Sequence, residues 1–366
     1  MMPFIEEDVL EPNVHLERSD QITAREVVAG KIKHKTRKSY NKKIGVFNIW
    51  LSEIHPDFYD IVAKSPMLPV PADIVAEFLA KISTVTDIKT KERRSASVSH
   101  VQSYRSALKF LYEEKNLIFE NETAIRISDF SSGYKRLVAD KKLNGEMSVQ
   151  EGKSPITFGG YNFVSQKALE MKEDFHLSLF AHLFLLLCWN LMARSVSVGT
   201  IMLQHISWEQ DSLLITTPKH KGDQEGNNCY PKHVYANPES PVICPVLSMS
   251  LLIFASGWKR DGSKHMLFQG AATESRFSKW LKATIKTCAV SIGLLGMLAF
   301  DIGTHSFRKG VATFVAGCPA GPSAINIFLR AGWSLGAVAS RYIFTGQGGD
   351  QVSYNYINNR LKCRYL

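Results

Sequence analysis

The most constraining feature of the sequence is a long apolar run from Phe175 to Ala193. A run of this length exceeds one β-strand, so it predicts a helix that is apolar on nearly every side. Such a helix is buried either in a lipid bilayer or in the core of a large domain. The polar residues His182 and Asn190 within the run, and Arg194 directly after it, favour the protein core. We therefore expect a domain built around this helix and no membrane span.

The chain is long enough for two domains and carries an excess of positive charge. It has 366 residues, and one domain takes roughly 100–200. There are 44 Lys and Arg against 34 Asp and Glu, a formal charge of +10. This excess favours a polyanionic partner such as nucleic acid, although many other proteins share it. The six cysteines form no CxxC pair, so the sequence predicts no zinc ribbon, and we expect no bound metal.

The first part of the chain predicts a tail followed by a helical domain. Residues 1–30 contain scattered acids and few core-forming side chains, and we expect a flexible acidic tail. Residues 31–145 show apolar side chains at helical spacing in four segments. These segments span 40–54, 71–82, 98–112 and 127–138. The pattern predicts a small domain of four helices.

Basic clusters accompany these predicted helices. The run Lys31–Lys43 holds seven Lys or Arg residues and no acid. It can be interpreted as a solvated surface, as an arm that contacts phosphates, or as a nuclear-import signal. A second cluster lies between the second and third helical segments. The side chains expected to contact DNA are Lys33, Lys35, Arg37, Lys38, Arg93, Arg94 and, farther along the chain, Lys219.

A polar segment at 144–155, with two glycines and a terminal proline, predicts an interdomain linker. The following residues, 155–345, have mostly helical patterns with one exception. Residues 212–217 and 230–235 predict two strands around the polar turn 219–228. The expected fold class is therefore mainly α with a small antiparallel β-sheet.

Several features of this second domain are uninformative alone. In the segment Thr304–Gly310, His305 and Arg308 lie three positions apart and share a face if the segment is helical. Arg194 follows the apolar run, where an arginine can simply cap a helix. Lys221 lies in the polar turn, where a lysine is usually only solvated.

Trp333, in a Gly-Trp pair, precedes Tyr342 by nine residues, and both aromatics suit an ordinary core. Taken in chain order, however, these features resemble the active site of the tyrosine recombinase/integrase family, including the Cre-like enzymes. The residues at 221–226 and 304–310 look most like those of eukaryotic mobile-element recombinases such as the Crypton group.

The resemblance covers residues 155–345, which it identifies as an α+β catalytic domain. The helical domain before it is similar to the family's core-binding domain, which clamps DNA. Residues 346–366 resemble the tether and terminal helix that family members dock onto a neighbouring subunit, although packing on their own domain is an equal alternative.

The chemistry implied by the resemblance is DNA cleavage and rejoining without a metal or another cofactor. Tyr342 would attack the phosphate and remain attached as a 3′-phosphotyrosine. Arg194 and Arg308 would neutralise the transition state, because each guanidinium offers forked donors and stays charged. Lys221 would be the general acid for the leaving 5′ oxygen, with Lys219 as its rival.

The remaining site residues support this reaction. His305 would take the phenolic proton or donate to a non-bridging oxygen. Trp333 stands where many relatives carry histidine, and its indole can donate a hydrogen bond but cannot shuttle protons. Ser197 stands where many relatives carry an acid, so we expect the support of the site to be reorganised.

The leading hypothesis is a site-specific recombinase, integrase or transposase that acts on double-stranded DNA as a homo-tetramer. The protein would be nuclear in a eukaryote, owing to residues 31–43, and otherwise cytoplasmic, in the nucleoid. One alternative is a DNA-relaxing enzyme like the type IB topoisomerases. Another is a domesticated DNA-binding protein without cleavage, against which the presence of all the reactive residues argues.

Overall fold

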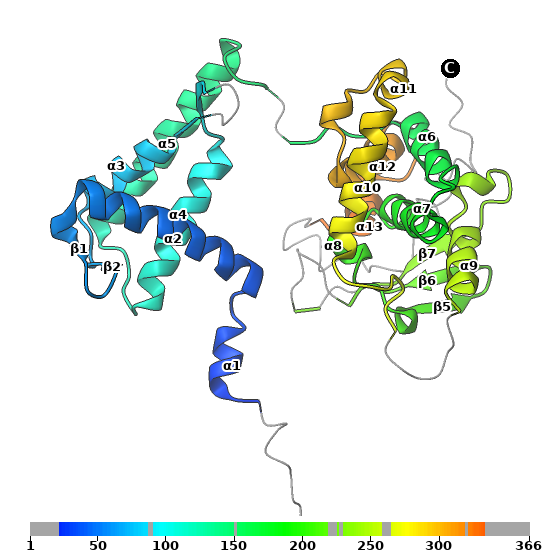
Figure 1. Ribbon diagram of the computed structural model, residues 1–366, viewed down its shortest axis with the longest axis horizontal. Helices are drawn as coiled ribbons and strands as arrows, with labels where there is room; N and C mark the ends of the chain where they lie inside the picture. The colour runs from blue at the N-terminus through cyan, green and yellow to red at the C-terminus, as the bar shows by residue number, and fades with distance from the viewer. Residues whose placement is uncertain are drawn as a thin grey trace, which may run out of the picture. The chain divides into compact units, whose positions relative to one another are not determined.

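The chain forms two compact units, residues 1–150 and 151–366 (Figure 1). The computed structural model describes residues 22–86, 91–149, 152–218, 225–226, 230–257, 265–318 and 321–333. The helices of the first unit are α1 (Ala24–Ala29), α2 (His34–Ile54), α3 (Ala72–Ile82), α4 (Val98–Glu114) and α5 (Asn121–Leu143), with a 3₁₀ turn at Pro56–Phe58. Its strands form two antiparallel hairpins, β1 (Tyr59–Asp60) with β2 (Ser65–Pro66), and β3 (Thr84–Thr86) with β4 (Arg93–Ser95).

The first unit has its own aromatic core, in which α2 packs on α4 and α3 packs on α5. The Phe78 ring lies 4.8 Å from that of Phe47 and 5.2 Å from that of Trp50, centroid to centroid. Such contacts are typical of edge-on and tilted aromatic pairs. The short helix α1, which begins with a capping box between Thr23 and Glu26, lies in the segment for which the sequence predicts a tail.

The second unit is also mainly helical. Its helices are α6 (Phe158–Leu169), α7 (Phe175–Asn190), α8 (Ser195–Val198), α9 (Pro245–Ser256), α10 (Thr273–Thr287), α11 (Ala289–Leu294), α12 (Thr304–Ala316) and α13 (Ala324–Ala331). Short 3₁₀ turns lie at Leu203–His205, Pro241–Ile243 and Ala299–Asp301, and the strands are β5 (Ile206–Glu209), β6 (Ser212–Ile215) and β7 (Lys232–Tyr235). The predicted fold class, mainly α with a small antiparallel sheet, is confirmed.

Helix α7 is the apolar run of the sequence, and it is the core helix that the sequence predicts. It lies in the middle of the second unit and contacts α6, α9, α10 and α12, which surround it (Figure 1). Every side chain from Ser178 to Asn190 is buried. In the described part of the chain, no helix is both long and apolar enough to cross a membrane.

The sheet of the second unit has the order β5-β6-β7, and both pairs are antiparallel. Strands β6 and β7 correspond to the two predicted strands. The sequence prediction missed β5, a four-residue edge strand that carries the exposed Trp208. It joins β6 through a tight turn in which Gln210 adopts a left-handed backbone with φ of 51°. A non-glycine residue gives little sign of such a turn in the sequence.

The polar residues of α7 are satisfied inside the core. The ring of His182 lies 2.8 Å from the Ser248 hydroxyl at Nδ1 and 2.7 Å from the Val242 carbonyl at Nε2. The carbonyl can only accept, so Nε2 carries the proton and Nδ1 accepts from the serine. Burial lowers the pKa of His182 to about 4, although the hydrogen bond to Val242 opposes this shift. His182 is therefore neutral at physiological pH.

We predict that this histidine makes the second unit sensitive to acid. In the unfolded chain an ordinary histidine takes up its proton near pH 6.5, whereas folded His182 does so only near pH 4. Stability is thus fully present above pH 6.5 and falls as the pH drops to 4, by up to about 3 kcal/mol. Urea unfolding across this pH range should show a shallower fall for His182→Gln than for the natural protein. Replacing the exposed His176 on the same helix is the control, and equal slopes for both variants would contradict the assignment.

Candidate active site

Arg194 is placed by the end of α7. The chain leaves this helix through a buried turn at 191–193, in which Met192 has a left-handed backbone with φ of 47°. Arg194 then forms the N-cap residue of α8, and its carbonyl accepts hydrogen bonds from the amides of Ser197 and Val198. The side chain is half-buried. Arg194 is thus fixed at the junction of two helices that both pack into the core.

Arg308 comes from α12, whose first turn also carries His305. Its side chain is only 8% exposed, and its Nη2 donates to the carbonyl of Ala331 at the end of α13. The guanidinium carbon lies 5.6 Å from the ring centroid of Trp333, a cation–π distance. His305 is exposed three residues before Arg308, a spacing that places both side chains on one side of the helix.

Arg194 and Arg308, distant in the sequence, share one electrostatic environment. Burial and, to a smaller extent, the positive charge of Arg194 together lower the pKa of Arg308 to about 10. Two guanidinium groups that repel each other in a partly buried site bind an anion favourably, because the anion relieves both the repulsion and the desolvation. Arg194 and Arg308 therefore form the centre of a candidate anion-binding site.

Trp333 completes the described part of the site. Gly332 ends α13 with a left-handed φ of 62°, which glycine adopts without strain. The turn directs the Trp333 ring against Phe328, with centroids 5.3 Å apart, and leaves the side chain 37% exposed. A half-exposed indole beside a guanidinium is able to donate its N–H to a bound phosphate oxygen.

The structure does not describe every residue that the sequence assigns to the site. Lys219, Lys221 and Tyr342 lie outside the described residues. The structure therefore brings together Arg194, Arg308 and Trp333, with His305 on the same helix as Arg308. The assignment of the nucleophile and the general acid stays a prediction. In the described segments, no cluster of three His, Cys, Asp or Glu side chains could hold a metal ion.

A carboxylate close to the residue after Arg194 comes from Glu274, which no sequence pattern marked as a site residue. The hydroxyl of Ser195 donates to Oε1 of Glu274 at 3.3 Å. Glu274 lies in the first turn of α10, where an acid is stabilised by the helix dipole. Ser197 stands where the resemblance noted in the sequence would place an acid, and Glu274 is an acid supplied from another helix to the same segment. Only the tertiary fold places it there.

The residues that the sequence predicts to bind DNA lie at two places in the first unit. Lys33, Lys35 and Lys38 are exposed at the start of α2, which is helical from His34 onward. Arg37 differs from its neighbours, because its Nη1 pairs with Glu114 at 2.8 Å and its guanidinium lies 5.4 Å from the Phe110 ring centroid. Arg93 and Arg94 are exposed on β4, the second strand of a hairpin.

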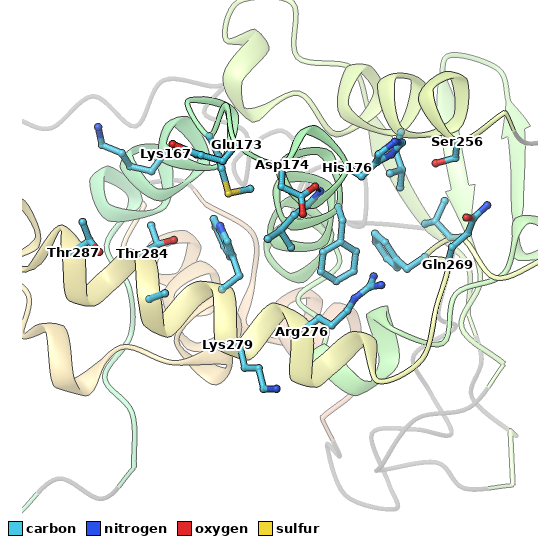
Figure 2. Close-up of a pocket in the computed structure, with 18 of the residues that line it drawn as sticks. Lys167, Glu173, Asp174, His176, Ser256, Gln269, Arg276, Lys279, Thr284 and Thr287 are labelled. Atoms are coloured by element: carbon cyan, nitrogen blue, oxygen red, sulfur yellow. Dashed lines mark hydrogen bonds between the residues drawn. The ribbon is translucent and has the colours of Figure 1, made fainter.

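A separate cavity of about 1210 Å³ lies between α7, α9 and α10. Its walls are mainly apolar, with Phe180, Leu252 and Trp280 among them. The guanidinium of Arg276 reaches from α10 toward Gln269 and lies 4.2 Å from the Phe180 ring centroid (Figure 2). Arg194, Arg308 and Trp333, which together we call the arginine site, do not line this cavity. The cavity is therefore a separate feature of the second unit.

Comparison with known proteins finds similarity in structure. No protein-family model matches the chain, and no curated protein matches its sequence. The Tn1549 transposon integrase, solved in complex with transposon right end DNA, is 13% identical. The match covers 87% of this chain and 92% of that chain with a TM-score of 0.54. The XerH site-specific recombinase bound to difH substrate is 14% identical, with 82% and 73% covered and a TM-score of 0.47.

The similarity to the Tn1549 integrase shows that the chain has the fold of the tyrosine recombinases and integrases, as its sequence predicts. The narrower likeness to the Crypton group stays a prediction. The sequence motif and the structural comparison therefore indicate the same fold for the domain that holds Arg194, Arg308 and Trp333.

The arginine pair should bind a small oxyanion in the free protein. We expect 50 mM sodium sulfate to raise the melting temperature by about 3 °C above sodium chloride of equal ionic strength. Arg194→Gln should lose this difference, because the substitution removes one of the two guanidinium groups that bind the anion. It should also melt no lower than the natural protein in chloride, since the like-charge repulsion is relieved. Lys282→Gln, on the exposed side of α10, is the control. An equal gain in all three proteins would mean that sulfate acts only as an excluded salt.

The close approach of α12 to the core sets the position of Arg308 and depends on a glycine. A Cβ added at Gly310 would lie 2.2 Å from the Ile156 carbonyl oxygen, a backbone atom that cannot move alone. We expect Gly310→Ala to destabilise the second unit by about 3 kcal/mol in urea unfolding. The matched control is Gly293→Ala in α11, where an added Cβ meets nothing within 4 Å. Equal stabilities would show that α12 shifts without strain.

Proposed function

We propose that the protein is a DNA strand-exchange enzyme that cleaves and rejoins DNA through a 3′-phosphotyrosine intermediate. The observation that carries this proposal is the partly buried Arg308 beside Trp333, where the positive charge of Arg194 adds to burial in lowering the pKa of Arg308. A phosphodiester in its transition state gains negative charge and is the ligand that this arrangement favours most. The integrase fold supports the same conclusion.

In the proposed reaction each site residue has one role. The phenol oxygen of Tyr342 attacks the phosphorus and the P–O5′ bond breaks, so the 5′ oxygen needs a proton. Lys221 donates that proton, with Lys219 as the alternative donor, and His305 takes the phenolic proton. Arg194, Arg308 and the Trp333 indole hold the non-bridging oxygens. The reverse steps rejoin the strand, so the reaction needs no nucleotide energy source.

The charge distribution makes metal assistance unnecessary in this proposal. Two guanidinium forks supply the positive charge that a divalent ion provides in other nucleases. Catalysis should therefore proceed in the presence of EDTA.

The first unit would bind the duplex and position it for cleavage. The exposed Lys33, Lys35 and Lys38 on α2 and Arg93 and Arg94 on β4 would contact phosphates. Arg37, held by Glu114 and Phe110, would contribute more to the placement of α2 than to DNA binding. We further propose a homo-tetramer that assembles on DNA and, in a eukaryotic host, nuclear localisation through residues 31–43.

The proposal predicts a covalent protein–DNA adduct on nicked suicide duplexes tiled across the ends of the DNA element that encodes the chain. The adduct should appear on a denaturing gel in the presence of EDTA and be lost in Tyr342→Phe. In Arg308→Gln its rate should fall on the order of 100- to 1,000-fold, because one transition-state donor is lost. Tyr354→Phe is the control for the choice of tyrosine. An adduct that survives Tyr342→Phe and disappears in Tyr354→Phe would refute the assignment.

The same samples separate the related functions. Recombinant products from two duplexes support strand exchange, whereas relaxation of a supercoiled plasmid without recombinants supports an enzyme like the type IB topoisomerases. Binding of duplex DNA with neither product, on the full set of tiles, would identify a DNA-binding protein without cleavage activity.

A further inference from the structure

The end of α7 has backbone acceptors that the local chain satisfies only in part. The carbonyls of residues 187–189 accept hydrogen bonds from the amides of the turn 191–193. The next two carbonyls, those of Asn190 and Leu191, accept from cationic side chains of distant elements. Lys232 on β7 donates to Leu191 at 2.9 Å, and Arg330 on α13 donates to Asn190 at 2.8 Å. The end of the core helix is thus held by two positive charges, which also match its dipole.

Arg330 also donates a hydrogen bond to strand β7, in addition to capping the end of α7. It is 3% exposed, and its guanidinium is shared between two elements. Nη2 donates to the carbonyls of Asn190 and His233, at 2.8 and 3.0 Å, and Nε lies 3.3 Å from the Asn190 carbonyl. One planar group therefore joins α13, the end of α7 and strand β7. A lysine ammonium lacks this fixed fork and cannot hold the same two carbonyls in one plane.

The position of Arg330 in the chain connects these contacts to the arginine site. The residue after it, Ala331, accepts the hydrogen bond from Arg308, and Trp333 follows two residues later. On the other side, the turn 191–193 separates the clamped end of α7 from Arg194. The last turn of α13 is therefore bonded to both halves of the site, to Arg308 directly and to the Arg194 segment through Arg330.

We propose that Arg330 is a positioning residue that fixes Arg194 relative to Arg308 and Trp333. This inference rests on the proposed function, because it assigns Arg330 a part in DNA cleavage. Arg330 is buried and donates to backbone carbonyls, so it does not touch DNA. Its effect is exerted through the separation and orientation of the two guanidinium forks that bind the phosphate. A displacement of about 1 Å at such a site is sufficient to slow a reaction by on the order of 100-fold.

The test compares three variants of the full-length protein, at a temperature at which each is fully folded by circular dichroism. Arg330→Lys keeps the charge and loses the fork. Lys232→Met removes the other cation from the same helix end but leaves α13 bonded to α7. Lys282→Met is the exposed control on α10. For each variant we would measure the rate of adduct formation on a nicked suicide duplex, the affinity for that duplex, and amide hydrogen exchange in peptides that cover 187–198.

Arg330→Lys should slow adduct formation on the order of 10- to 100-fold, with duplex affinity within about twofold of the natural protein. Lys232→Met should slow it less, and Lys282→Met should not change it. Hydrogen exchange at 187–198 should be faster in Arg330→Lys than in the Lys282→Met control. A purely structural role would lower the melting temperature and leave the rate per folded molecule unchanged, and that result would overturn the proposal.

The design separates this inference from the proposed function. If the natural protein forms no adduct on any duplex, the proposed function fails, and hydrogen exchange alone decides whether Arg330 holds the Arg194 segment. If the natural protein forms the adduct and Arg330→Lys matches it in rate and in exchange, the positioning role fails while the function stands.

Discussion

The main constraint on the second unit is that it holds two like charges, those of Arg194 and Arg308, in a partly buried site. Burial of Arg308 and its repulsion by Arg194 together lower the pKa of Arg308 to about 10. This arrangement does not stabilise the free protein, so the surrounding elements must supply the free energy that maintains it. They do so through the apolar contacts of α7 and α12 and through hydrogen bonds from the cations to backbone carbonyls.

Helix α7 supplies most of that framework. Its uncharged, buried surface contacts helices on several sides, and it ends at the turn that presents Arg194. The polar groups needed at this end come from elsewhere, as Lys232 on β7 and Arg330 on α13. An apolar helix thus provides rigidity, while cations on neighbouring elements satisfy its terminal carbonyls and set the direction of the chain that follows.

Much of this organisation could be predicted from the sequence, and the exceptions share a cause. The apolar run, the strand pair around residues 212–235 and the spacing of His305 and Arg308 are local patterns, and each follows from a repeat of 3.6 or 2 residues. Glu274 and Arg330 contribute through contacts with residues far away in the chain, so no local pattern marks them. The edge strand β5 was missed because it is short and the turn that follows it contains no glycine.

The two hydrophobic clusters have a consequence for how this molecule can change. One is built from described residues between Phe47 and Val138, and the other from described residues between Ile156 and Ala331, with no member in common. Each unit therefore buries its apolar side chains in a cluster of its own. The unit that we propose to bind the duplex and the unit that we propose to cut it thus have separate hydrophobic cores. Chimaeras joined between residues 144 and 155 would inherit each core whole.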